Sequence, residues 1–235
     1  MSQPDANSTQ QPIASRLHAI GLMALIAVWA YGGVISAANL HSRVGPPLVF
    51  YYLRAIVFDW LVVAYIVVGV RRRGGSLRDL IGGSWRRAGD FWRDVLVAFV
   101  FWIVSLACLA ILRLALHAKS GVHAIRFLTP VSRSETILWI LVALTAGFCE
   151  ETIFRGYLQR QFIAWSGKPA IGILFSAALF GGVHAYQGAK QTILLGVFGA
   201  MFGVLAYKRQ SLRPGMMAHA WQDALAGLVV RLLPK

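Results

Sequence analysis

Apolar segments long enough to cross a lipid bilayer recur along most of this chain. A helix needs about 20 residues to cross roughly 30 Å of hydrocarbon. With 57% hydrophobic and 14% charged residues, the chain is too apolar for a water-soluble domain of its 235 residues. We therefore expect an all-α fold, a polytopic membrane helix bundle with about seven transmembrane helices. Their predicted ranges are 17–39, 47–70, 93–116, 135–158, 168–186, 190–207 and 213–231.

The chain divides into three regions by composition. Residues 1–15 are polar and predict a disordered tail. Residues 16–134 predict N-terminal transmembrane helices, the first of them longer in its apolar part than a signal peptide. Residues 135–231 complete the bundle. Since no repeat or low-complexity linker separates these parts, one membrane domain is expected.

Basic residues concentrate in one connection, which predicts the orientation. The net charge is +14, and seven arginines fall within residues 71–93. They carry no nucleic-acid recognition motif, so we interpret them as a basic cytoplasmic loop beside the membrane and not as a DNA-binding face. This predicts an integral, multi-pass protein with a cytoplasmic N-terminus. The 18 arginines against 5 lysines hint at a GC-rich genome, hence a bacterial inner membrane.

Ionisable residues inside the predicted helices are the strongest functional signal. Charges within the membrane are costly, so such residues are functional candidates by default. Six of them cluster in the last hundred positions: Glu150, Glu151, Arg155, His184, His219 and Asp223.

The spacing of these residues on helices suggests different tasks. Glu151 and Arg155 are four apart, in the favourable order for an ion pair. Glu150 points about 100° away on an α-helix, so it is freer to face a cavity and to act as a general base on water. His219 and Asp223 are also four apart, so the carboxylate can orient the imidazole.

Three short motifs in order resemble a known family. They are the EExxxR string at Glu150–Arg155, the FxxxH string "FGGVH" that ends at His184, and the HxxxD string "HAWQD" that begins at His219. Over about residues 135–230 they are similar to the signature of the CPBP intramembrane proteases. That family includes type II CAAX prenyl endopeptidases and bacterial bacteriocin-processing and self-immunity proteins.

The resemblance implies an intramembrane endopeptidase that acts on a membrane-associated protein or peptide, with prenylated CAAX-type proteins among the candidate substrates. It implies a catalytic site within the membrane that opens toward the cytoplasm. Glu150 would activate water and His184 would bind or polarise it, while His219 and Asp223 would stabilise the oxyanion. Arg155 with Glu151 would hold the first motif in place, and Phe180 of the second motif would contact substrate.

Two questions about this site stay open at the sequence level. The prenyl endopeptidases carry Asn where this chain has Asp223, so Asp223 would be protonated, orient His219 or ligate a metal. Glu150, His184, His219 and Asp223 have the ligand types of a divalent metal site, such as one for Zn²⁺. The HExxH string of many zinc proteases is absent.

Other functions remain as alternatives. A non-catalytic self-immunity or scaffold protein would keep the fold without turnover. A proton-coupled transporter would also place Glu, His and Asp in the membrane, but the inverted repeats that it predicts are not seen. The polar residues could also be a structural ion pair and core histidines. Arg54 and Asp59 lie in the second segment, and we expect snorkelling or contacts with other helices there in preference to catalysis.

Overall fold

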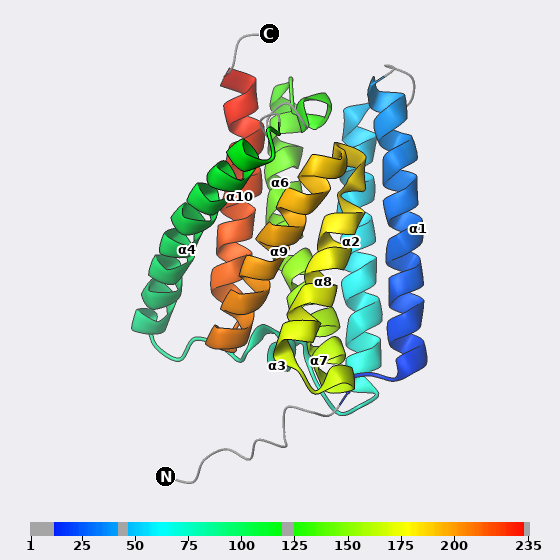
Figure 1. The fold of residues 1–235 in the computed structure, drawn as a ribbon, viewed down its shortest axis with the longest axis vertical. Coiled ribbons are helices and arrows are strands. Elements are labelled where there is room, and N and C mark those ends of the chain that lie inside the picture. The colour runs from blue at the N-terminus through cyan, green and yellow to red at the C-terminus, as the bar shows by residue number, and fades with distance from the viewer. Residues whose placement is uncertain (1–11, 42–46, 119–124, 233–235) are drawn as a thin grey trace.

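The computed structural model describes residues 12–41, 47–118 and 125–232, and Figure 1 shows these ranges as an upright helix bundle. Seven α-helices form its length: α1 (Arg16–His41), α2 (Leu48–Arg71), α4 (Ala88–Ala115), α6 (Arg133–Glu150), α8 (Pro169–Val183), α9 (Ala189–Arg209) and α10 (Arg213–Leu232). Shorter helical pieces connect them: α3 (Leu77–Ile81), η1 (Arg126–Leu128), η2 (Glu151–Gln159), α7 (Arg160–Ser166) and η3 (Ala185–Gln187).

The expected membrane bundle is confirmed, with one difference in how its helices span. Within the described ranges, five helices are long and apolar enough to cross a membrane: Arg16–Ala38, Leu48–Arg71, Ala88–Ala115, Arg133–Ser166 and Ala189–Arg209. Helix α8 is apolar but has only 15 residues. Helix α10 is not among the five, and it carries His219 and Asp223. A helix therefore lies at each of the seven predicted positions, but two of them are not clear spans.

The bundle turns apolar side chains outward and polar ones inward. Leu114 is 76% exposed and Leu174 is 63% exposed, whereas Glu151, Arg155 and Gln159 are buried. In a bilayer the lipid tails are as apolar as leucine, so burial of apolar side chains does not drive helix association. Polar groups, by contrast, must find partners inside the protein. The buried polar residues therefore mark the functional interior.

Two glycines allow close helix contacts around that interior. A Cβ at Gly147 of α6 would lie 2.7 Å from the Met216 carbonyl oxygen of α10. A Cβ at Gly181 of α8 would lie 2.6 Å from the Thr192 carbonyl oxygen of α9. Since α6 and α10 carry the glutamate and histidine motifs, Gly147 sets how near these motifs lie.

Helix α6 begins at a capping box. The Ser132 hydroxyl accepts a hydrogen bond from the Glu135 backbone N–H at 3.2 Å, and the Glu135 carboxylate accepts one from the Ser132 N–H at 3.0 Å. The helix therefore begins at Arg133, two residues before the predicted start at 135. The reciprocal bonds satisfy two backbone donors at the end of the helix.

Part of the predicted tail is folded. Residues 1–11 lie outside the described ranges, but Ala14 is fully buried. Its backbone N–H donates to Gln161 Oε1 at 3.2 Å, and its carbonyl accepts from Gln161 Nε2 at 3.1 Å. The prediction of disorder through residue 15 is therefore wrong at Ala14, because a buried amide on α7 pairs with its backbone.

The arginine-rich connection lies at the end of the bundle where α1 begins (Figure 1). Asp94 at the start of α4 pairs with Arg209 at 3.1 Å and with Arg213 at 3.5 Å. Arg160 of α7 donates to the Asp79 and Leu80 carbonyl oxygens of α3. These contacts tie the connection to the starts and ends of four helices.

Candidate active site

The first motif lies on a π-helical segment. The sequence predicts one α-helix over 135–158, but the α-helix ends at Glu150 and η2 follows over Glu151–Gln159. Hydrogen bonds from residue i to i+5 give a wider turn than in an α-helix, and such turns are frequent at functional sites. All nine residues of η2 are buried. The predicted helix is present, but its geometry at the motif differs.

The expected Glu151–Arg155 ion pair is present and fully buried. Arg155 Nη1 lies 3.0 Å from Glu151 Oε1, and both side chains are 1% exposed. Arg155 Nη2 donates to the Gly199 carbonyl oxygen of α9 at 3.1 Å. The guanidinium carbon lies 4.3 Å from the ring centroid of Phe180 on α8. Arg155 therefore joins three elements of the site.

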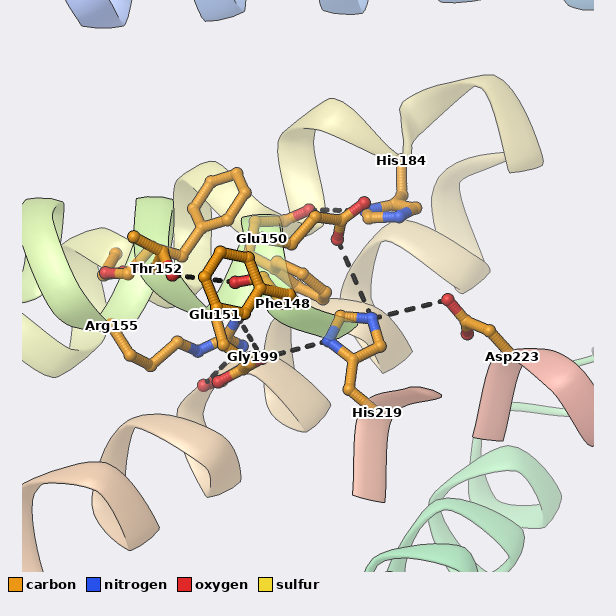
Figure 2. A network of polar contacts seen from close by, with 12 residues as sticks. Phe148, Glu150, Glu151, Thr152, Arg155, His184, Gly199, His219 and Asp223 are labelled. Atoms are coloured by element: carbon orange, nitrogen blue, oxygen red, sulfur yellow. Dashed lines mark hydrogen bonds and ion pairs between the residues drawn. The ribbon is translucent and has the colours of Figure 1, made fainter. Parts of the chain in front are cut away.

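His219 lies between three carboxylates (Figure 2). Its Nδ1 lies 3.0 Å from Glu151 Oε1, a hydrogen bond in which the ring N–H donates to the carboxylate. Its Nε2 lies 3.8 Å from Glu150 Oε2 and 3.5 Å from Asp223 Oδ2. The expected contact with Asp223 exists, but the closest carboxylate is Glu151 from another element.

His184 is oriented by its own helix. Its Nδ1 lies 2.8 Å from the Phe180 carbonyl oxygen. A carbonyl only accepts, so Nδ1 carries the proton in this contact and a neutral ring presents a free lone pair on Nε2. Nε2 can therefore accept a hydrogen bond from a water molecule.

Phe180 is buried beside the two imidazoles, and its predicted contact with substrate stays a prediction. Its side chain is 1% exposed and lies behind the site, 4.8 Å from the His184 ring and 5.9 Å from the His219 ring, centroid to centroid. The phenyl ring fills the space between Arg155 and the two imidazoles. Its place is that of a packing residue, because the other side chains of the site cover it.

A cavity of about 260 Å³ reaches the site. Glu150, His184 and Asp223 line it, whereas Glu151 and His219 do not. Glu150 Oε2 is buried and has no hydrogen-bond partner. Of the two adjacent glutamates, one is thus held by Arg155 and His219, and the other faces the cavity with an oxygen that makes no hydrogen bond.

Residues outside the three motifs also line the cavity. Asp59 and Arg54 of α2 line it, as does Tyr186 of η3. Asp59 lies close enough to Glu150 and His219 to interact electrostatically with both. Arg54 contacts α1 through Ser36 Oγ at 3.0 Å, so its predicted contact with another helix is confirmed. Only their position within the membrane could have flagged Arg54 and Asp59, because no motif includes them.

The cavity extends toward the end of the bundle away from the arginine-rich connection. It is lined by the second half of α1 and the first half of α2, together with η1, η3 and the second half of α10. These parts lie at the end opposite to the start of α1 (Figure 1). A cytoplasmic N-terminus and a cavity that opens toward the cytoplasm, both expected from the sequence, therefore do not fit together.

The candidate metal ligands do not form a metal centre. In the part of the chain that the structure describes, no group of three or more His, Cys, Asp or Glu residues is placed to hold a metal ion, and this includes Glu150, His184, His219 and Asp223. His219 has one ring nitrogen bonded to Glu151, and its other ring nitrogen lies 3.5 Å from Asp223 and 3.8 Å from Glu150. The arrangement does not fit the zinc site that the residue types suggest.

The family comparison agrees with the motifs. Residues 132–225 match the family model described as type II CAAX prenyl endopeptidase Rce1-like. Over these residues the chain is similar to the Rce1-like family, in line with the resemblance that the motifs carry. The match covers α6 through most of α10, and so every residue of the three motifs. No curated protein and no solved structure matches the chain.

At the level of the family, this match supports a membrane-embedded protease of the CAAX type, a class that acts on proteins or peptides. The region before residue 132 is outside the match, yet its helix α2 contributes Arg54 and Asp59 to the cavity.

Proposed function

We propose that this protein is an endopeptidase that hydrolyses a peptide bond of a membrane-associated protein or peptide, with Glu150 as the base that activates water. One observation supports this most strongly: Glu150 lines the cavity with a buried oxygen that makes no hydrogen bond and lies 3.8 Å from His219 Nε2, next to a neighbour that is fully paired. A purely structural glutamate inside a membrane would be expected to make a close hydrogen bond or ion pair.

In the proposed reaction, water lies between Glu150 and His184. The His184 Nε2 lone pair accepts one hydrogen bond from the water and fixes its position, while the Glu150 carboxylate takes the other proton. The water oxygen forms a bond to the carbonyl carbon of the substrate. The protonated Glu150 then gives its proton to the leaving nitrogen as the carbon–nitrogen bond breaks.

His219 and Asp223 act on the oxyanion in this proposal. The two contacts of His219 Nε2, at 3.5 and 3.8 Å, are too long for strong hydrogen bonds. A proton on Nε2 is therefore available to an oxyanion that comes between Glu150 and Asp223. Asp223 orients the imidazole, and Glu151 fixes the ring from the other side through Nδ1.

The test is turnover by purified protein in detergent. A prenylated CAAX reporter and a library of membrane peptides are offered to wild type, Glu150→Gln and Glu135→Gln. Glu135 is the matched control, since it is a half-buried carboxylate on the same helix and caps its start, away from the three motifs. We expect cleavage by wild type and Glu135→Gln and none by Glu150→Gln. Equal rates in all three would remove the proteolytic assignment and favour a non-catalytic immunity or scaffold protein.

For the orientation, we propose that the arginine-rich connection faces the cytoplasm, since basic loops favour that side. The cavity then extends toward the opposite face. Single cysteines introduced at Ser84 in the connection and at Val131 before α6 test this with an impermeant maleimide on intact cells, in a background without Cys108 and Cys149. Val131 is 74% exposed and should react, while Ser84 should react only after the membrane is opened.

A further inference from the structure

Arg54 is an arginine inside the membrane that has no carboxylate partner within the described ranges. It lies on α2 six residues after the helix begins, and no ion pair of the described residues includes it. Its Nε is buried without a hydrogen-bond partner. An unpaired charge at such a position is costly and marks a functional site by default. Simple snorkelling into the headgroups would leave it at the lipid surface, but Arg54 lines the cavity.

The neighbours of Arg54 hold the guanidinium in one orientation. Nη2 donates to Ser36 Oγ at 3.0 Å, and that hydroxyl donates to the Gly32 carbonyl oxygen at 2.7 Å. The guanidinium carbon lies 4.9 Å from the ring centroid of Trp29 and 5.4 Å from that of Tyr51. These groups fix the orientation but supply no negative charge. The site is thus preorganised for an anion.

The charges of the cavity place that anion away from the reacting groups. Asp59 lies five residues beyond Arg54, about 7.5 Å along the helix axis at 1.5 Å per residue. Asp59, Glu150 and Asp223 make the inner part of the cavity acidic, so an anionic group would be repelled there. Arg54, near the start of α2, is the position in the lining where an anion is attracted.

A peptide substrate carries one anionic group of the required planar shape, its terminal carboxylate. The guanidinium fork matches a carboxylate with two parallel hydrogen bonds, and Nε is one of the donors still free for this. Resting on the peptidase activity proposed above, we propose that Arg54 binds the free terminal carboxylate of the substrate and so makes cleavage depend on a free C-terminus. This binding also sets the direction of the peptide, with its carboxyl end toward the start of α2.

The experiment compares one prenylated CAAX peptide as the free acid and as the C-terminal amide. For wild type, the KM of the acid should be about 10- to 100-fold lower than that of the amide, the effect expected from one charge-assisted hydrogen bond. In Arg54→Gln the KM for the acid should rise to that of the amide, with kcat changed little. Arg54→Lys should lie between, since it keeps the charge and loses the fork. Arg113→Gln is the matched control, because Arg113 is another helix arginine with an unpartnered Nε, but lies outside the cavity lining.

A binding measurement separates this proposal from the peptidase assignment. Calorimetry on Glu150→Gln in nanodiscs gives the Kd of the acid and the amide without turnover, with and without Arg54→Gln. An acid preference that Arg54→Gln abolishes supports the carboxylate site even if no variant cleaves the peptide. Equal Kd values for acid and amide overturn it, whether or not cleavage is found. If a lipid phosphate were the anion, acid and amide would bind alike, and both would bind more weakly in phosphatidylglycerol than in phosphatidylcholine, which also overturns the proposal.

Discussion

Replacing Glu151 with Gln should destabilise the helix packing around the site, whereas the same change at Glu150 should leave that packing intact. In Glu151→Gln the buried Arg155 keeps the Gly199 carbonyl and the face of Phe180 but loses its one close carboxylate. Removal of one partner from a buried pair costs about 3–5 kcal/mol, because the other charge is left uncompensated. Glu150 has no hydrogen-bond partner at Oε2, so its replacement leaves no comparable gap.

Cys149 offers a direct measurement of this destabilisation. Its side chain is fully buried beside the two glutamates, and Cys108, which is exposed, can be replaced by Ser. A maleimide then reacts with Cys149 only when the helix packing opens. At about 1.4 kcal/mol per factor of ten, Glu151→Gln should raise the labelling rate in detergent by roughly 100- to 4,000-fold, and Glu150→Gln by less than about 5-fold. Equal labelling of the two variants would refute the division of roles between the adjacent glutamates.

Three further predictions concern the same site. Gly147→Ala should lower the free energy of unfolding by about 1–3 kcal/mol and reduce kcat, because the new Cβ would lie 2.7 Å from the Met216 carbonyl oxygen. Thermal unfolding measures the loss, and Gly32→Ala is the control, since a Cβ there would meet no packed neighbour within 4 Å. Asp223→Asn should keep kcat within about 3-fold of wild type or raise it, since an amide can donate a hydrogen bond to the oxyanion, and a loss beyond 100-fold would show that the negative charge is needed. Cleavage should be unchanged after treatment with a zinc chelator, because the site residues do not form a metal-binding group; loss of turnover that added zinc restores would contradict this.

Contacts within one helix could be predicted from the sequence. The Glu151–Arg155 pair and the His219–Asp223 contact follow from a spacing of four residues, and both are present. The seven apolar segments likewise predicted where the long helices lie, because the bilayer sets their length. The family motifs then predicted which of these helices carry the polar residues.

Contacts between helices could not be predicted in this way. The closest partner of His219 is Glu151, 68 positions earlier, and nothing in either motif indicates that contact. The placement of Arg54 and Asp59 in the same cavity depends on how α2 packs against α6. The burial of Phe180 depends on the rings and the guanidinium that surround it. Such contacts are set by the rotation and depth of each helix, which hydropathy leaves undetermined.

The π-helical segment Glu151–Gln159 has a consequence for how this sequence can vary. Most membrane helices alternate between a lipid face, where apolar residues exchange freely, and a packed face, so tolerance to substitution follows the helix turn. All nine residues of η2 are buried, so the segment has no lipid face. A saturation mutagenesis scan should therefore find one uninterrupted block of nine sensitive positions. Along α1 or α4, tolerant positions are expected to recur with each helix turn.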